Sequence, residues 1–290
     1  MKDLVGKLAV LTGAASGIGR ELARQLVGEG CHIAIGDIDP YRLEETVELC
    51  NSANPRAVTI TALRCDVADE AAVRQFVDDT RSRHATDHID LLINNAGITG
   101  GGSFVEDSRE EWERTFNICW SGVYLMTRNF LPLLLKSREG HLVNMSSANG
   151  LRAVLGGHVP HTAYSTAKFA VRGFSEALIH DFRFNAPHLH VSVVMPGHTD
   201  TNIVSNSLRV LGREVPERSD TQSTQVSGMA PAEAARVILE GVKRKQWRIL
   251  IGSDTRTLDR LVRESPESAY DPDFVDRWRE ANRKYSDPGS

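Results

Sequence analysis

The sequence predicts a single-domain α/β protein built on a doubly wound, seven-stranded parallel sheet. The chain has 290 residues, a length that one large α/β domain can fill. Apolar residues make up 41% of it, an ordinary value for a globular protein. Short β-rich apolar runs alternate with longer segments of helical period. This alternation is typical of parallel sheets, because each right-handed crossover returns the chain to the same end of the sheet.

Seven short apolar runs are expected to be strands, and six amphipathic segments between them are expected to be helices. The expected strands are Leu8–Thr12, Ile33–Asp37, Val58–Cys65, Ile89–Asn94, Leu142–Met145, Val191–Met195 and Arg248–Ile251. The expected helices are Ile18–Val27, Arg42–Asn51, Ala71–Arg83, Glu110–Lys136, Tyr164–Arg183 and Pro231–Lys245. Ligands of such sheets bind at the carboxyl ends of the strands, beside the point where the strand order reverses. Functional residues are therefore expected directly after the strands.

Two stretches do not follow the alternation. The segment at about residues 198–228 is rich in Ser, Thr and Asn, and a connection of this length is expected to be a lid over the site. Residues 253–290 follow the main domain, residues 1–252, and carry apolar residues at helical spacing. They are expected to form a C-terminal helical extension that docks on the body or on a neighbouring subunit.

Charge and cysteine usage narrow the possible partners. The net charge is −4, with basic and acidic residues mixed along the chain, which is not the pattern of a nucleic-acid binder. The start of the chain, Met1–Lys7, is charged, and no apolar run approaches the roughly 18 residues of a membrane span. A cytoplasmic protein without a membrane partner is expected. Cys31, Cys50, Cys65 and Cys119 stand far apart, so they are interpreted as reduced thiols and no metal is expected.

A glycine-rich turn follows the first expected strand and runs directly into a helix. It contains Gly13, Gly17 and Gly19, with Ser16 and Ile18 between them. Glycines let the backbone come close to a ligand, and the N–H groups at the start of a helix favour a pyrophosphate. One alternative is a turn that only packs the strand against the helix. The position after the first strand favours dinucleotide binding.

The residue at the end of the second expected strand bears on the choice of cofactor. Asp37 is placed where a carboxylate accepts hydrogen bonds from the adenosine ribose hydroxyls and repels a 2′-phosphate. Neither Ser16 nor Ile38 supplies a positive charge that would hold that phosphate. NAD is therefore expected rather than NADP. Alternatively, Asp37 only starts a turn with Asp39 and Pro40.

With these features, the sequence resembles the short-chain dehydrogenase/reductase family over about residues 5–252. This resemblance implies a Rossmann fold. The family's TGxxxGxG pattern spans residues 12–19, its NNAG element spans residues 94–97 and its YxxxK motif spans residues 164–168. The further residues that the resemblance places around the cofactor are Asp66, Val67, Asn94, Ala96, Gly97, Tyr164, Lys168, Pro196, Gly197, Thr199 and Thr201. It also implies that Ser147, Tyr164 and Lys168 are catalytic and that Lys168 holds the nicotinamide ribose.

The chemistry of these residues follows from their spacing. Tyr164 and Lys168 are four residues apart and face the same side of the expected helix. The Lys168 ammonium, together with the charge of an oxidised nicotinamide, is expected to lower the pKa of the Tyr164 phenol toward working pH. Tyr164 would act as general acid and base during hydride transfer, and Ser147 would donate a hydrogen bond to the substrate oxygen. The segment is equally well an ordinary amphipathic helix, and the two interpretations are compatible.

One position departs from the family pattern. Cys119 stands where the family has an asparagine that completes a Ser-Asn-Tyr-Lys tetrad and holds a water beside the lysine. Asn117 lies two residues earlier, roughly 200° around a regular helix, so it cannot replace that group without a local irregularity. An altered proton relay is expected, with Cys119 as a small buried filler.

The loop between Ser147 and Tyr164 is longer than the family usually has. It carries His158 and His161, which together with Asn149 and Ser147 are candidate substrate-binding residues. Specificity often resides in a loop beside a rigid site. The alternative is that both histidines are simply solvated, as surface histidines usually are.

The sequence is therefore interpreted as an NAD-dependent oxidoreductase that interconverts a secondary alcohol and a ketone on a medium to bulky apolar substrate. One alternative is an NADP-dependent carbonyl reductase. Another is a cofactor-binding sensor or scaffold with reduced turnover, motivated by Cys119. The resemblance implies a homodimer or homotetramer, and the apolar length of Trp112–Leu135 is consistent with this.

Overall fold

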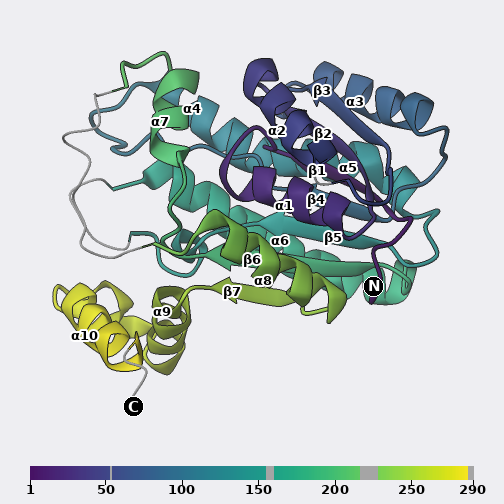
Figure 1. Ribbon diagram of the computed structural model, residues 1–290. Coiled ribbons are helices and arrows are strands. Elements are labelled where there is room, and N and C mark those ends of the chain that lie inside the picture. Colours follow the sequence, from purple (N-terminus) through teal and green to yellow (C-terminus); the bar gives the residue numbers. More distant parts are fainter. Residues whose placement is uncertain (53, 155–159, 216–227, 287–290) are drawn as a thin grey trace.

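The expected strands form one parallel sheet in a computed structural model that describes residues 1–52, 54–154, 160–215 and 228–286. They are β1 (Leu8–Thr12), β2 (His32–Asp37), β3 (Ile60–Arg64), β4 (Leu91–Asn94), β5 (His141–Met145), β6 (His190–Pro196) and β7 (Arg248–Ile251). The strand order is β3-β2-β1-β4-β5-β6-β7 (Figure 1). Neighbouring strands all run parallel. The predicted fold class is confirmed, and the order reverses between β1 and β4.

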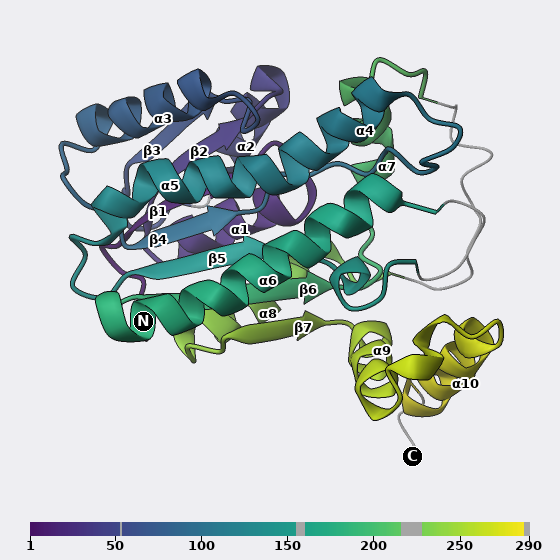
Figure 2. The same cartoon turned by 180° about the vertical axis from the view of Figure 1, so that it is seen from behind.

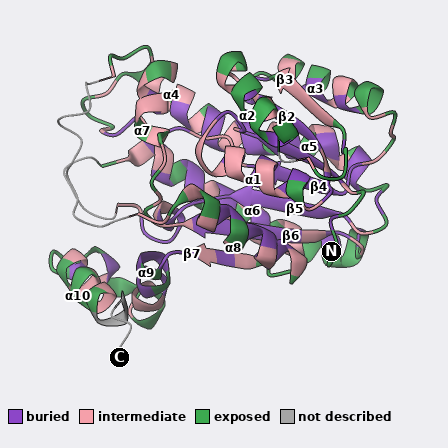
Figure 3. Ribbon diagram, in the orientation of Figure 1, coloured by how far each residue is buried: buried purple, intermediate pink, exposed green. Residues whose placement is uncertain are grey.

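Helices cover both faces of the sheet, because successive residues of a strand point to opposite sides. The helices of one face are α1 (Gly17–Gly28), α2 (Pro40–Ser52) and α8 (Pro231–Lys243). Those of the other face, seen in Figure 2, are α3 (Glu70–Arg83), α5 (Gly122–Leu134) and α6 (Thr162–Asn185). In β1, Ala9 and Leu11 pack into the first layer, whereas Leu8 and Val10 pack into the second. Figure 3 shows the central strands buried between these layers, whereas the edge strand β3 is only partly buried.

The helix expected over residues 110–136 is interrupted. α4 (Arg109–Phe116) is followed by a π-helical turn, Asn117–Ser121, before α5 begins. The N–H of Gly122 donates to the carbonyl of Asn117, five residues back. Such a turn shifts the side chains that follow it around the helix axis relative to a regular α-helix.

The expected lid contains a helix, α7 (Ile203–Val210), and its residues 216–227 lie outside the described residues. α7 lies over the same end of the sheet as α4 (Figure 1). Ser207 holds it there, because its hydroxyl accepts a hydrogen bond from the backbone N–H of Thr99 at 2.8 Å. The helix therefore reaches the carboxyl ends of the strands.

The C-terminal extension docks on the body of its own chain. It consists of α9 (Ser253–Glu264), a 3-10 turn (Glu267–Tyr270) and α10 (Phe274–Ser286). Its buried apolar residues pack against β6 and the segment that follows β5. Arg152 Nε donates to the carbonyl of Ala269 at 2.5 Å, and Ala153 N–H donates to the Tyr270 hydroxyl at 3.0 Å. Within the described part of the chain, no helix is both long and apolar enough to span a bilayer.

Candidate active site

The glycine turn between β1 and α1 is packed tightly against the end of β4. Gly13 has a left-handed backbone with φ +69°, and a Cβ there would lie 2.8 Å from the Cα of Ala96. Gly19 lies against the carbonyl oxygen of Gly13, so it has no room for a side chain. Asn95 Nδ2 holds this arrangement by donating to the carbonyls of Thr12 and Gly13 at 3.0 and 3.1 Å. The turn therefore fits a dinucleotide, whose pyrophosphate needs bare backbone at a helix N-terminus.

A cavity of about 220 Å³ opens beside this turn. Its walls contain the following expected cofactor residues: Gly13, Ser16, Gly17, Ile18, Gly19, Asp37, Ile38, Asp66, Val67, Ala96, Gly97 and Thr201. Thr201 reaches across from the segment after β6, and its Cγ2 would lie 3.3 Å from a Cβ on Gly17. Segments that are far apart in the sequence are thus brought to one cavity at the point where the strand order reverses.

Six other expected cofactor residues are not among the residues that line this cavity: Asn94, Tyr164, Lys168, Pro196, Gly197 and Thr199. Asn94 is buried in the sheet, where its Nδ2 donates to Thr127 Oγ1 at 2.9 Å and to Asn144 Oδ1 at 2.8 Å. Its neighbour Asn95, which the sequence interpretation did not single out, lines the cavity instead. Cofactor roles for all of the expected residues, those that line the cavity included, remain predictions.

Asp37 is placed at the cavity and also forms the turn that the sequence offered as the alternative. It lines the cavity, and it also accepts hydrogen bonds from the backbone N–H groups of Ala15 and Asp39, at 2.9 and 3.0 Å. Burial raises the pKa of the Asp37 carboxyl, and these hydrogen bonds act in the opposite direction. Its carboxylate therefore starts the turn into α2 while it faces the site.

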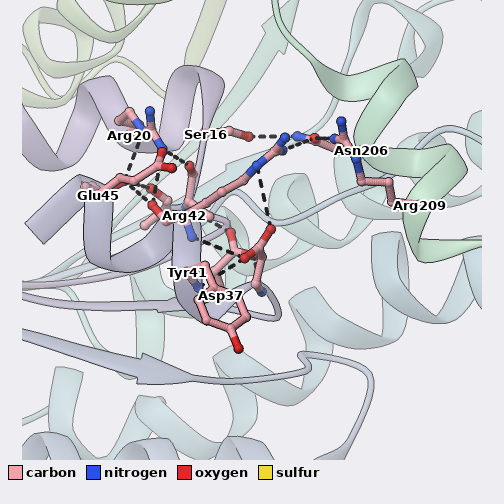
Figure 4. Close-up of polar contacts among 12 residues, drawn as sticks. Ser16, Arg20, Asp37, Tyr41, Arg42, Glu45, Asn206 and Arg209 are labelled. Atoms are coloured by element: carbon pink, nitrogen blue, oxygen red, sulfur yellow. Dashed lines mark hydrogen bonds and ion pairs between the residues drawn. The ribbon is translucent and has the colours of Figure 1, made fainter. Parts of the chain in front are cut away.

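Three arginines in the cavity wall were missed by the sequence interpretation. Arg114 of α4 forms an ion pair with Asp66 at 2.8 Å. Arg42 of α2 and Arg209 of α7 lie beside Asn206 (Figure 4). No local motif marks these residues, because only the folded chain brings α2, α4 and α7 to one cavity.

α6 carries Tyr164 and Lys168 on one face, as expected. Lys168 Nζ lies 5.4 Å from the centroid of the Tyr164 ring and donates to the carbonyl of Met145 at 2.8 Å. A Cβ on Gly97 would lie 3.5 Å from the same Nζ, so the lysine borders the cavity. Ser147 follows β5 and hydrogen-bonds to the Tyr164 side chain. The three expected catalytic side chains therefore meet beside the cavity.

The expected lowering of the Tyr164 pKa is not found in the chain alone. Burial raises the pKa of the Tyr164 phenol, and the hydrogen bond with Ser147 only partly opposes this. Burial also lowers the pKa of the Lys168 ammonium, because the charged form loses its hydration. Desolvation thus outweighs the attraction that the sequence interpretation assigned to Lys168, and the phenol is protonated at neutral pH.

The π-helical turn settles which residue faces Lys168. It is the kind of irregularity that Asn117 would need, yet Asn117 remains exposed, and its Oδ1 accepts from the Ser121 hydroxyl at 3.2 Å. Cys119 is buried instead, and its Sγ donates to the carbonyl of Ile98 at 3.2 Å. Burial raises the pKa of the Cys119 thiol, so it remains a neutral, weak donor.

Of the candidate substrate residues, Ser147 and His161 lie near Tyr164. The His161 ring is 6.5 Å from the Tyr164 ring, centroid to centroid, and its Nδ1 is buried with no hydrogen-bond partner among the described residues. Burial lowers the pKa of His161. Asn149 Nδ2 donates to the Ala153 carbonyl at 2.9 Å, so it holds the loop. His158 lies outside the described residues.

Known proteins resemble this chain along most of its length. A family model described as short chain dehydrogenase matches residues 7–210. The putative oxidoreductase SadH of Mycobacterium tuberculosis is 34% identical over 263 residues, which are 91% of this chain and 92% of SadH. The 3-oxoacyl-(acyl-carrier-protein) reductase FabG of Aquifex aeolicus is 30% identical over 81% of this chain and 90% of its own. A short-chain dehydrogenase/reductase from Burkholderia phymatum, solved in complex with NAD, has a TM-score of 0.79 and 27% identity, covering 94% of this chain and 98% of that one.

Proposed function

Since the chain belongs to the short-chain dehydrogenase/reductase family, we propose that it is an NAD-dependent oxidoreductase that interconverts a secondary alcohol and a ketone. The observation that carries this proposal is the meeting of Ser147, Tyr164 and Lys168 beside the cavity that the glycine turn lines. The structural relative from Burkholderia phymatum holds NAD, and the Aquifex aeolicus relative is named as a 3-oxoacyl reductase. Both names agree with this chemistry.

The residues of the cavity fit NAD. The glycine turn and the start of α1 would take the pyrophosphate, and Asp37 would accept hydrogen bonds from the adenosine ribose. Lys168 borders Gly97 and would hold the nicotinamide ribose. When bound, the nicotinamide would supply or accept the hydride.

The chain's own residues move the proton. Because burial raises the pKa of Tyr164, its phenol carries a proton at neutral pH and donates it to the ketone oxygen during reduction. Ser147 donates a hydrogen bond to the same oxygen as negative charge develops there. In the reverse direction Tyr164 takes the alcohol proton, which requires the phenolate. The positive charges of Lys168 and of the oxidised nicotinamide would favour that phenolate.

We propose a medium to bulky, largely apolar substrate. Exposed apolar side chains flank the site: Phe104 is 76% exposed and Val204, at the start of α7, is 53% exposed. The loop that carries Phe104 is bonded to the start of α6 through the Gly101 carbonyl and the Ala163 N–H. His161, with its unpartnered Nδ1 near Tyr164, would give this pocket one polar contact to the substrate.

We also propose a homodimer or homotetramer in the cytoplasm. The layer of α5 and α6 exposes Tyr124, Phe169 and Phe184, by 45%, 38% and 69%. A second copy would cover this set of apolar side chains. Light scattering on the purified protein measures the oligomeric state directly.

The proposed location in the cytoplasm is supported by the cysteines. All four are buried free thiols, which suits a reducing compartment.

The proposed reaction is tested with NAD and a panel of secondary alcohols, following NADH by its absorbance. Tyr164→Phe is expected to lower kcat by about a hundredfold or more, because general acid and base catalysis is removed, while NADH binding is retained. Tyr124→Phe removes a tyrosine hydroxyl from α5, outside the residues that line the cavity, and serves as the control, provided that light scattering shows an unchanged oligomeric state. A Tyr164→Phe enzyme as fast as the parent would disprove the acid and base role.

A further inference from the structure

Two positively charged side chains converge on one neutral amide at the edge of the cavity. Arg42 Nη1 and Arg209 Nη1 both donate to Asn206 Oδ1, at 2.5 and 2.9 Å (Figure 4). The Nδ2 of Asn206 donates in turn to the Ser16 hydroxyl at 2.9 Å. All four residues line the cavity, and they come from the glycine turn, α2 and α7.

The negative charge beside this arginine pair does not balance its two positive charges. Arg42 has one ion pair, with Asp39 at 3.7 Å, and Arg209 has none with the residues that the structure describes. By contrast, the nearby Arg20 forms an ion pair with Glu45 at 2.8 Å (Figure 4). A single amide oxygen does not neutralise two guanidinium groups, so an anion placed between them would relieve their mutual repulsion.

Hydrogen bonds hold the backbone of both helices that carry these arginines. The Asp39 carboxylate accepts from the N–H of Arg42 at 3.2 Å. Arg20 Nη2 donates to the carbonyls of Arg42 and Ala15, at 3.2 and 2.6 Å, which ties the start of α2 to the glycine turn. On the other side, the Ser207 contact with Thr99 holds α7 in place. A ligand in the cavity therefore meets a preformed pair of cations.

We propose that Arg42 and Arg209 together form a binding site for a phosphate of the dinucleotide; this inference rests on the proposed function. The phosphate replaces the Asn206 amide oxygen between the two guanidinium groups. Guanidinium groups suit this ligand because they bind phosphate oxygens in a bidentate manner. The site lies where Ser16 and Asp37 meet the cavity. It supplies from α2 and α7 the positive charge that Ser16 and Ile38 lack. Two phosphates have the required chemistry, the pyrophosphate of any nicotinamide dinucleotide and the 2′-phosphate of NADP.

Isothermal titration calorimetry with ADP-ribose and with 2′-phospho-ADP-ribose tests the proposal on the full chain. Arg42→Gln and Arg209→Gln are each expected to weaken binding by about tenfold or more, the usual effect of losing a charge-assisted hydrogen bond. Arg244→Gln is the control, because Arg244 ends α8 at the opposite end of the sheet, is 71% exposed and has the same charge. Thermal unfolding verifies that each variant is folded.

The two ligands identify the phosphate. Equal loss for both ligands assigns the arginines to the pyrophosphate, whereas loss for 2′-phospho-ADP-ribose alone assigns them to the 2′-phosphate. Unchanged binding of both ligands would overturn the inference and leave the proposed function standing. If the wild-type chain bound neither ligand, the proposed function would fail and the inference with it.

Asn206→Ala separates ligand binding from a purely structural role. If a phosphate displaces the Asn206 amide, removing that amide leaves the two arginines free for the ligand, and binding is as tight as in the wild type or tighter. Weakened binding in Asn206→Ala, like that in Arg209→Gln, would instead mean that the three side chains only latch α7 to α2. That result would overturn the phosphate site.

Discussion

Replacing Lys168 by methionine is expected to stabilise the fold while it removes activity. Lys168 is 3% exposed, and no carboxylate among the described residues acts on its ammonium. Among the residues that the structure describes, this ammonium donates one hydrogen bond, to the carbonyl of Met145 at 2.8 Å. Methionine has a similar length and no charge, so it fits the same space without the desolvation penalty.

The size of the effect follows from two opposing contributions. Replacing buried ion pairs by apolar side chains of similar volume is often neutral or stabilising by about 1–4 kcal/mol, and the lost hydrogen bond to Met145 costs about 1 kcal/mol. We therefore expect Lys168→Met to raise the free energy of unfolding by up to ~3 kcal/mol at neutral pH.

The gain is expected to depend on pH. Because burial lowers the pKa of Lys168 in the folded chain, the unfolded chain binds more protons at any pH between the folded pKa and the ordinary lysine pKa. Wild-type stability relative to the variant therefore rises with pH across that interval. Below the folded pKa the penalty is complete, and above the ordinary pKa it is absent. The advantage of the variant should shrink as the solution becomes alkaline.

Urea unfolding followed by circular dichroism, without coenzyme, measures the difference at neutral and at alkaline pH. Lys136→Met is the matched control: its side chain is 55% exposed, and surface substitutions of this kind usually change stability by less than about 0.5 kcal/mol. A Lys168→Met protein less stable than the wild type at neutral pH, or an advantage independent of pH, would refute the reasoning.

Two further substitutions test the site. Gly13→Ala is expected to lower stability by about 1–2 kcal/mol through its left-handed backbone and to impair coenzyme binding, because its Cβ would press on Ala96. In the control Gly28→Ala the Cβ meets nothing within 4 Å; calorimetry and thermal unfolding compare the two. Cys119→Asn is expected to keep kcat within about threefold, since an amide donates to the same carbonyl at least as well as a thiol. A large loss of turnover would show a specific role for the cysteine.

The sequence was enough for the sheet and for most of the cavity, because strand periodicity and the glycine turn are local patterns. Asp37, Gly97 and Thr201 all reach the cavity, as predicted. The features that the sequence interpretation missed depend on contacts between distant parts of the chain. Arg42 and Arg209 come together only when α7 packs over the end of the sheet. The raised pKa of Tyr164 depends on how deeply α6 is buried, which helical spacing does not reveal.

The π-helical turn and the lid illustrate the same limit. The sequence indicated that Asn117 could take the place of the family's asparagine only if the helix were irregular. The irregularity exists, yet it leaves Asn117 in solvent. For the lid, polar composition predicted a long connection, whereas α7 within it is held by contacts with residues about a hundred positions away.

The last helices of the chain are joined to the loop that follows Ser147. Arg152 and Ala153 both donate to the 3-10 turn of the extension, at Ala269 and Tyr270. If the chain ended after β7, Arg152 Nε and the Ala153 N–H would lose these two hydrogen-bond acceptors. Both donors lie within six residues of Ser147 in the sequence. The C-terminal extension thus fixes the position of the loop next to Ser147 from outside the main sheet.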